Sequence, residues 1–126
     1  MGKVYSIEMN KYSYKNAKEN IKLNKVSNII LMNGKVEEEI KKIDEKVDLI
    51  ICDPPRSGMD KFTIETILKM KPKELVYMSC DVITLARDLN ILKEEYDLVK
   101  IKAFDMFPNT YHVESVSLLS LKTLEK

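Results

Sequence analysis

The sequence has few of the features that mark secreted or membrane proteins. It contains only two cysteines, Cys52 and Cys80, which are too few for a disulfide framework. It also lacks an apolar run as long as a membrane-spanning helix requires. We therefore expect a cytoplasmic protein whose two thiols are reduced.

An excess of charge of one sign is also lacking, since 21 lysines and arginines oppose 20 acidic residues and leave a net charge of +1. This balance neither supports nor excludes a nucleic-acid partner, because a basic stripe can exist on a neutral protein. The sequence does have the composition of a globular domain, with 44% hydrophobic residues among 126. That length predicts a single domain over residues 1–126 with its own core.

The spacing of the apolar residues predicts alternating strands and helices. Strands are expected at Val4–Ile7, Ile29–Met32, Val47–Cys52, Leu75–Met78, Leu98–Phe104 and Val116–Leu121. Helices are expected from the capping residue Asn10 to Asn24, at Val36–Ile43, at Phe62–Met70 and at Thr84–Glu95. This order indicates an α/β protein with a doubly wound, mostly parallel sheet. The last two strands have no helix between them, so we expect them to pair antiparallel.

Three polar residues follow predicted strands, where open α/β sheets bind their ligands. Glu8 suits the two hydroxyls of a ribose, or it is a first-turn acid that complements the helix dipole. Asp53 precedes Pro54 and Pro55, which stiffen the loop, or it belongs to a plain strand-ending turn. Cys80 lies before a helix, whose N-terminus would stabilise a thiolate.

The two cysteines have different surroundings in the sequence. For Cys80 the alternative to a reactive thiol is a buried structural cysteine, which is the commoner role. Cys52 lies inside an apolar run, so we expect it to be buried and inert.

Three segments of the chain carry a distinctive pattern. They are Asp53–Gly58 (DPPRSG), Ser79–Leu89 (SCDVITLARDL) and Phe107–Val116 (FPNTYHVESV). In this order and spacing they resemble the RNA uracil-5-methyltransferases that use S-adenosylmethionine. The resemblance extends over nearly the whole chain. It implies a Rossmann-like methyltransferase sheet and an enzyme that modifies RNA, ribosomal rather than transfer RNA.

The resemblance also implies roles for individual residues. Cys80 matches the nucleophile, and Glu114 matches the base that removes the proton from carbon 5 of uracil. Glu8 and Asp53 match acids of the cofactor site. Lys35 stands where the family often has Asp or Asn near the adenine, although a lysine cannot accept a hydrogen bond from the adenine amino group. No metal site is expected.

The chemistry of carbon 5 explains these residue types. This carbon is too weak a nucleophile until a thiolate adds at carbon 6, and a base must afterwards remove its proton. The target base must also be unpaired or flipped out of the helix. Phe107 and His112 are candidates to line that pocket, or they pack around a hairpin. Arg56 is a candidate to contact phosphate, or it holds an acidic side chain.

Glycine is scarce, and this matters once the resemblance is considered. The three glycines, at positions 2, 34 and 58, form no G-x-G cluster. The family's catalytic domain begins with a strand and a Gly-rich turn that have no counterpart here. We therefore expect a C-terminal fragment of the catalytic domain that is inactive alone. Its sheet should be interrupted or repacked where the family's first strand would lie.

Two other functions fit parts of the sequence. A methyltransferase acting on an exocyclic nitrogen of a nucleobase also uses a D-P-P loop, but it needs neither Cys80 nor Glu114. A non-catalytic fragment would instead form a homodimer through the exposed edges of its sheet.

Overall fold

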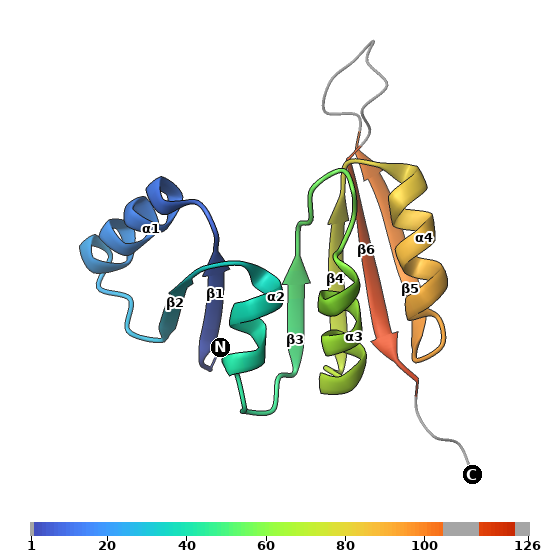
Figure 1. Ribbon diagram of the computed structural model, residues 1–126, viewed down its shortest axis with the longest axis horizontal. Coiled ribbons are helices and arrows are strands. Elements are labelled where there is room, and N and C mark those ends of the chain that lie inside the picture. Colours follow the sequence, from blue (N-terminus) through green and yellow to red (C-terminus); the bar gives the residue numbers. More distant parts are fainter. Residues whose placement is uncertain (1, 105–113, 123–126) are drawn as a thin grey trace. The chain divides into compact units, whose positions relative to one another are not determined.

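The computed structural model describes residues 2–104 and 114–122, and these residues form two compact units. Unit 1 spans residues 1–44, and unit 2 spans residues 45–126. The described strands form two sheets, one in each unit: β1-β2, and β3-β4-β6-β5 (Figure 1). Among the described residues, β1 pairs only with β2 and β3 pairs only with β4. The described strands therefore form two separate sheets.

Unit 1 is a β-α-β arrangement followed by two short helical turns. Its elements are β1 (Val4–Glu8), α1 (Lys11–Leu23), β2 (Ile29–Asn33), α2 (Val36–Glu39) and the 3₁₀ helix η1 (Ile40–Lys42). Asn10 caps α1, because its Oδ1 accepts hydrogen bonds from the amides of Tyr12 (2.9 Å) and Ser13 (3.0 Å). The strands β1 and β2 run parallel, so Glu8 and Asn33 end at the same edge. The single helix expected at Val36–Ile43 is divided into α2 and η1.

Unit 2 holds most of the buried core. Its elements are β3 (Leu49–Cys52), α3 (Lys61–Met70), β4 (Glu74–Ser79), α4 (Val82–Leu92), β5 (Tyr96–Phe104) and β6 (Glu114–Leu121). The strands β3 and β4 are parallel, whereas β6 is antiparallel to both β4 and β5. The antiparallel pairing of the last two strands is confirmed. Because β6 also pairs with β4, it lies between β4 and β5.

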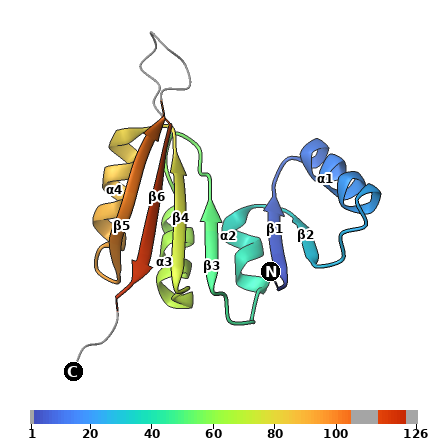
Figure 2. The same ribbon diagram turned by 180° about the vertical axis from the view of Figure 1, so that it is seen from behind.

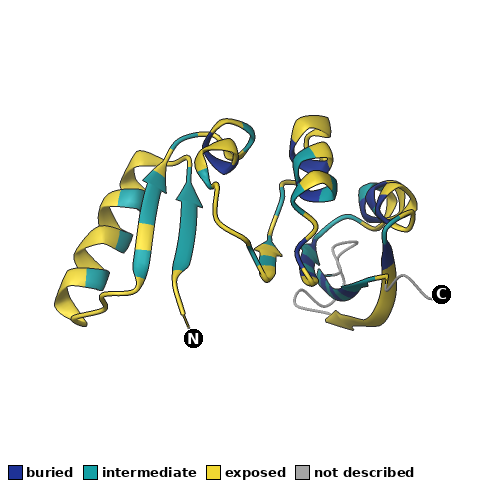
Figure 3. Ribbon diagram, turned by 90° about the horizontal axis from the view of Figure 1, so that it is seen from below, coloured by how far each residue is buried: buried dark blue, intermediate teal, exposed yellow. Residues whose placement is uncertain are grey.

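Both helices of unit 2 cover the same face of its sheet, as the two opposite views show (Figures 1 and 2). Buried residues alternate along β4 and β6, with Leu75, Tyr77 and Leu119 among the most deeply buried. Viewed along the strands, the buried positions of α3 and α4 face that side of the sheet (Figure 3). The second face carries no helix among the residues that the structure describes. In unit 2, therefore, the described helices cover one face of the sheet only.

The helix α4 ends earlier than its sequence pattern predicted. It stops at Leu92 and not at Glu95, and β5 already begins at Tyr96. Tyr96 is 1% exposed, and its hydroxyl donates a 2.7 Å hydrogen bond to the carbonyl oxygen of Pro72. Burying this aromatic ring requires the chain to turn before it, and three residues between Leu92 and Tyr96 form that turn. The helix is shorter because tertiary packing of Tyr96 outweighs local propensity.

None of the described helices combines the length and the apolar character of a segment that crosses a membrane.

Candidate active site

The candidate site of unit 2 lies at the edge where β3 and β4 end. Cys52, the last residue of β3, lies beside Tyr77 of β4 in the parallel register. Asp53 and Cys80 follow the two strands directly. The structure therefore brings Asp53 and Cys80 to one edge of the same sheet, where ligands of α/β sheets bind.

The antiparallel strand β6 begins at this same edge. Ser79, the last residue of β4, pairs with Ser115 of β6. The ladder ends at this pair, with Cys80 next after Ser79 in the chain and Glu114, the first residue of β6, directly before Ser115. Cys80 and Glu114 therefore both adjoin the last pair of the β4–β6 ladder, at the edge where β3 and β4 end. Both residues are half-buried and accessible from the edge.

The turn around Cys80 is held by Ser79 and Asp81. The Ser79 hydroxyl donates to the Asp81 carbonyl oxygen (2.8 Å) and accepts from the Asp81 amide (3.1 Å). The Asp81 carboxylate caps α4 by accepting the Thr84 amide at 2.9 Å. This backbone hydrogen bond from Thr84 is the main cause that lowers the pKa of Asp81 below its usual range, and the charge of Arg56 adds to it. An N–H of the first turn of α4 is therefore taken by Asp81.

Cys52 lies on the helix-covered side of the same sheet, level with the buried Tyr77. Its Sγ donates to the carbonyl oxygen of Val76 at 3.4 Å. Burial raises the pKa of the Cys52 thiol to about 12, and the negative charges of Asp88 and Asp53 add to this effect. The thiol is half-buried and stays protonated, which agrees with the inert role predicted for it.

Iodoacetamide is therefore expected to alkylate Cys80 at least about 100-fold faster than Cys52 at pH 8, because only the thiolate reacts. A thiol with a pKa of about 12 is ionised in roughly one molecule in 10⁴ at that pH. Peptide mass spectrometry over a time course measures both rates. In the control variant Cys80→Ser, Cys52 should react only after the chain is unfolded in urea. Similar rates for both cysteines in the native chain would contradict the assignment.

In unit 1, Glu8 lies at the corresponding edge of β1 and β2. Its Oε1 accepts the amide of Asn10 at 3.1 Å, and its carbonyl oxygen accepts from Asn33 Nδ2 (2.9 Å) and the Gly34 amide (3.1 Å). These bonds orient a half-buried carboxylate at the end of the strand. Lys35 is exposed and is the N-cap residue of α2, where its side chain makes no capping hydrogen bond.

The remaining predicted site residues are placed differently. Arg56 is exposed in the loop after Pro55, and its backbone carbonyl oxygen accepts a 2.7 Å hydrogen bond from Thr84 Oγ1. Phe107 and His112 lie outside the described residues. Within the described part of the chain, no group of three or more His, Cys, Asp and Glu side chains is arranged to hold a metal ion.

Sequence reasoning missed a cluster around Asp88, which is fully buried on α4. Asp88 Oδ2 accepts hydrogen bonds from the Tyr77 hydroxyl (2.5 Å) and the Met59 amide (2.8 Å). A signal was present in the sequence, because Asp88 shares the buried face of α4 with Leu85 and Leu92. A carboxylate on such a face needs partners, since an unpaired buried charge is strongly unfavourable.

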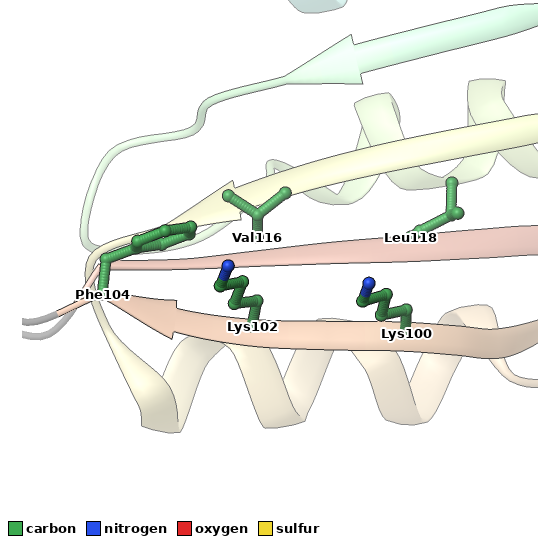
Figure 4. A pocket seen from close by; sticks show the side chains of 5 residues that line it. All are labelled: Lys100, Lys102, Phe104, Val116 and Leu118. Carbon is green, nitrogen blue, oxygen red and sulfur yellow. The ribbon is translucent and has the colours of Figure 1, made fainter.

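A shallow hollow of about 230 Å³ lies on the helix-free face of unit 2. Its lining side chains, all labelled in Figure 4, are Lys100, Lys102, Phe104, Val116 and Leu118. None of the residues predicted for the site lines it, but Phe104 at one end of it pairs with Glu114 across β5 and β6.

Known proteins resemble this chain in sequence. The profile of the tRNA (uracil-5-)-methyltransferase family matches residues 1–122. A relative from Listeria innocua, named as an RNA methyltransferase, is 43% identical over 123 residues, which are 94% of this chain and 27% of the relative. A relative from Caldanaerobacter subterraneus with the same kind of name is 45% identical over 120 residues, 92% of this chain and 26% of the relative. The chain thus spans about a quarter of the length of these relatives.

Solved structures show the same similarity. The Pyrococcus abyssi tRNA (uracil-54, C5)-methyltransferase in complex with S-adenosyl-L-homocysteine superposes with a TM-score of 0.80 and 33% identity. The match covers 93% of this chain and 28% of that one. An rRNA methylase from Streptococcus thermophilus, 17% identical with a TM-score of 0.73, covers 95% of this chain and 74% of that one, and shows a shared fold.

Proposed function

Because the chain belongs to the tRNA (uracil-5-)-methyltransferase family, we propose that it forms the catalytic part of an enzyme that methylates carbon 5 of a uridine in RNA. Cys80 is the covalent nucleophile, Glu114 is the base, and S-adenosylmethionine is the methyl donor. The observation that carries the proposal is the strand register, in which the β4–β6 ladder ends at the Ser79–Ser115 pair that both Cys80 and Glu114 adjoin.

The chemistry follows from the two side chains. The Cys80 thiolate adds to carbon 6 of the uracil ring and makes carbon 5 nucleophilic. Carbon 5 would then take the methyl group from the sulfonium of the donor, which would leave as the neutral thioether S-adenosylhomocysteine. Glu114 then removes the proton from carbon 5, and elimination restores both the ring double bond and the free thiolate. Glu114 starts β6 half-buried at the edge, where it can reach the same ring from the strand beside Cys80.

We assign two carboxylates, one in each unit, to hydrogen bonds with the nucleoside cofactor. Glu8 would accept from the ribose hydroxyls, and its orientation by the Asn10 amide favours this. Asp53 is exposed at the end of β3 and would contribute a second acceptor. Lys35 can donate but not accept, so a different group must bind the adenine amino group. Glu8 and Asp53 suit the ribose hydroxyls of the cofactor, but they do not replace a Gly-rich loop that would bind it through backbone amides.

The RNA class is a further part of the proposal. We propose ribosomal RNA as the substrate and the cytoplasm as the compartment. We assign Arg56 to a phosphate of that RNA, because Arg56 is exposed and its charge acts on Asp81, next to Cys80. Phe107 and His112 remain candidates for the pocket that holds the flipped-out base.

The isolated chain is expected to bind S-adenosylmethionine only weakly, with a dissociation constant above about 100 μM. None of its three glycines forms a G-x-G cluster, so backbone amides that would approach the cofactor closely are lacking. Isothermal titration calorimetry measures the affinity. The Listeria innocua relative serves as the positive control, and a dissociation constant near 1 μM for this chain alone would contradict the expectation.

Nucleoside analysis of methylated RNA tests the reaction itself. We define the chimaera as the Listeria innocua relative with its matched region replaced by this chain. Incubated with unmodified ribosomal or transfer RNA and the methyl donor, the chimaera should produce 5-methyluridine. Methylation on a base nitrogen, or no 5-methyluridine from a chimaera that folds and binds the donor, would refute the proposal.

A second candidate is self-association without catalysis, favoured by the edge strand β3. Leu49 and Ile51 on this strand are 41% and 62% exposed, and β3 pairs on one side only within the described residues. Exposed apolar edges of this kind are templates for pairing with another chain. Size-exclusion chromatography with light scattering distinguishes the two candidates, because a monomer across the micromolar range would exclude this one.

A further inference from the structure

The segment between β3 and α3 is attached to α4 by side chains that the proposed reaction does not use. The Arg87 guanidinium donates from Nη2 to the carbonyl oxygens of Ser57 (2.7 Å) and Met59 (3.4 Å). Thr84 Oγ1 donates to the carbonyl oxygen of Arg56 at 2.7 Å. The carbonyl groups of Arg56, Ser57 and Met59 are thus held from the first turns of α4, the helix that begins immediately after Cys80 and Asp81.

Asp88 completes this attachment from the buried side. It accepts the Met59 amide at 2.8 Å, and Arg87 donates to its Oδ1 from Nη2 (2.9 Å) and Nε (3.1 Å). The Tyr77 hydroxyl also donates a hydrogen bond to Asp88. Burial is the main cause that raises the pKa of Tyr77, and this hydrogen bond adds to it, so the hydroxyl keeps its proton. Asp88 therefore joins β4, the loop and α4 at one carboxylate.

Gly58 shows that the loop approaches α4 too closely for any side chain. Its φ is +81°, in the left-handed region that favours glycine. A Cβ atom there would lie 2.5 Å from Arg87 Nη2 and 2.7 Å from Asp88 Oδ2. The backbone at Gly58 is thus pressed against both side chains, and the loop has little freedom to move relative to the helix.

We infer that Arg87 and Asp88 are positioning residues, which act through the backbone of residues 56–59 to hold Asp53 and Arg56 at a fixed place beside Cys80. This inference rests on the proposed function, since Asp53 and Arg56 serve the cofactor and the RNA there. The Arg87 side chain is half exposed, at 51%, so its ion pair with Asp88 adds little to stability. Its two hydrogen bonds to loop carbonyls act on the position of the loop.

Hydrogen exchange on the isolated chain tests the attachment. In Arg87→Ala, the amides of Gly58 and Met59 should exchange at least about tenfold faster, whereas the Val76 amide in β4 keeps its rate, because only local opening is affected. Arg87→Lys should fall between wild type and Arg87→Ala, since a lysine keeps the charge but not the fork of donors. Gly58→Ala should release the loop in the same way, although Arg87 and Asp88 themselves are not substituted, because the added Cβ atom would clash with both side chains.

Tyr77→Phe is the matched structural control. It removes one hydrogen bond from Asp88 but none from the loop. It should therefore speed the exchange of loop and β4 amides together. The attachment is wrong if Arg87→Ala speeds the exchange of loop and β4 amides together, as Tyr77→Phe does. It is also wrong if the loop amides of Arg87→Ala exchange at the wild-type rate.

The chimaera tests what the attachment does for the reaction. Arg87→Ala and Gly58→Ala should lower kcat for 5-methyluridine formation about 100-fold, as expected for a misplaced site, and should also raise KM for RNA because Arg56 is displaced with the loop. Unchanged kcat with a released loop would overturn the positioning role and leave the proposed function intact. A wild-type chimaera without 5-methyluridine would instead overturn the proposed function and the positioning role with it, while the exchange rates would still decide whether the attachment exists.

Discussion

Glu114→Gln in the chimaera is expected to trap the enzyme on ordinary uridine, as a covalent complex between Cys80 and the methylated RNA. Glutamine cannot take up the proton from carbon 5, so elimination of the thiol stalls after the methyl group has been transferred. Turnover should fall by a factor of about 10² to 10⁴, the usual contribution of a general base. Denaturing gel electrophoresis with labelled RNA shows the trapped complex as a slowly migrating band.

The matched control is Glu74→Gln, at the opposite end of the same sheet. Glu74 is exposed and pairs with Ser120, so it lies at the far end of the β4–β6 ladder from Ser79 and Ser115. Its replacement should leave turnover unchanged and trap nothing. A Glu114→Gln enzyme that turns over at the rate of the control would remove Glu114 from the mechanism.

Asp88→Ala is expected to cost about 3–5 kcal/mol of the free energy of unfolding of this chain. The reason is that the Tyr77 hydroxyl and the Met59 amide, both hydrogen-bonded to the buried Asp88, lose their acceptor, at about 1–3 kcal/mol each. A cavity adds to the cost. Since small domains are stable by only about 5–15 kcal/mol, much of the chain should unfold at moderate urea concentrations.

Urea denaturation followed by circular dichroism measures this change. The control is Asp97→Ala on β5, because Asp97 is exposed and its removal should change stability by no more than about 0.5 kcal/mol. If the two variants unfold at the same urea concentration, the Asp88 hydrogen bonds do not stabilise the fold.

The order of strands and helices follows from local patterns and was predicted correctly. Asn10 signals the start of α1, and the nearly continuous apolar run before Asp53 signals a parallel strand, although Leu49 and Ile51 of β3 are exposed and not covered. Because two strands with no helix between them can only return by a turn, the antiparallel pairing of β5 and β6 was also predictable. These features depend on neighbours in the sequence.

Other features depend on contacts between distant residues, which a single sequence does not reveal. The position of β6 between β4 and β5, which brings Glu114 to the edge where β4 ends, is a matter of strand order in space. The early end of α4 depends on the burial of Tyr96 against Pro72. The role of Asp88 depends on Met59, 29 positions away in the chain. In the sequence, Asp88 stood out only as an acid on an apolar helix face.

The central claim is that Cys80 forms a covalent bond to uracil. RNA carrying 5-fluorouridine tests it most directly, because fluorine at carbon 5 cannot leave as a proton does, so the adduct accumulates after methyl transfer. With the chimaera we predict a stable protein–RNA complex whose mass maps to the peptide containing Cys80, and no complex with Cys80→Ala. A complex that still forms with Cys80→Ala, or one attached to a different residue, would contradict the assignment of the nucleophile.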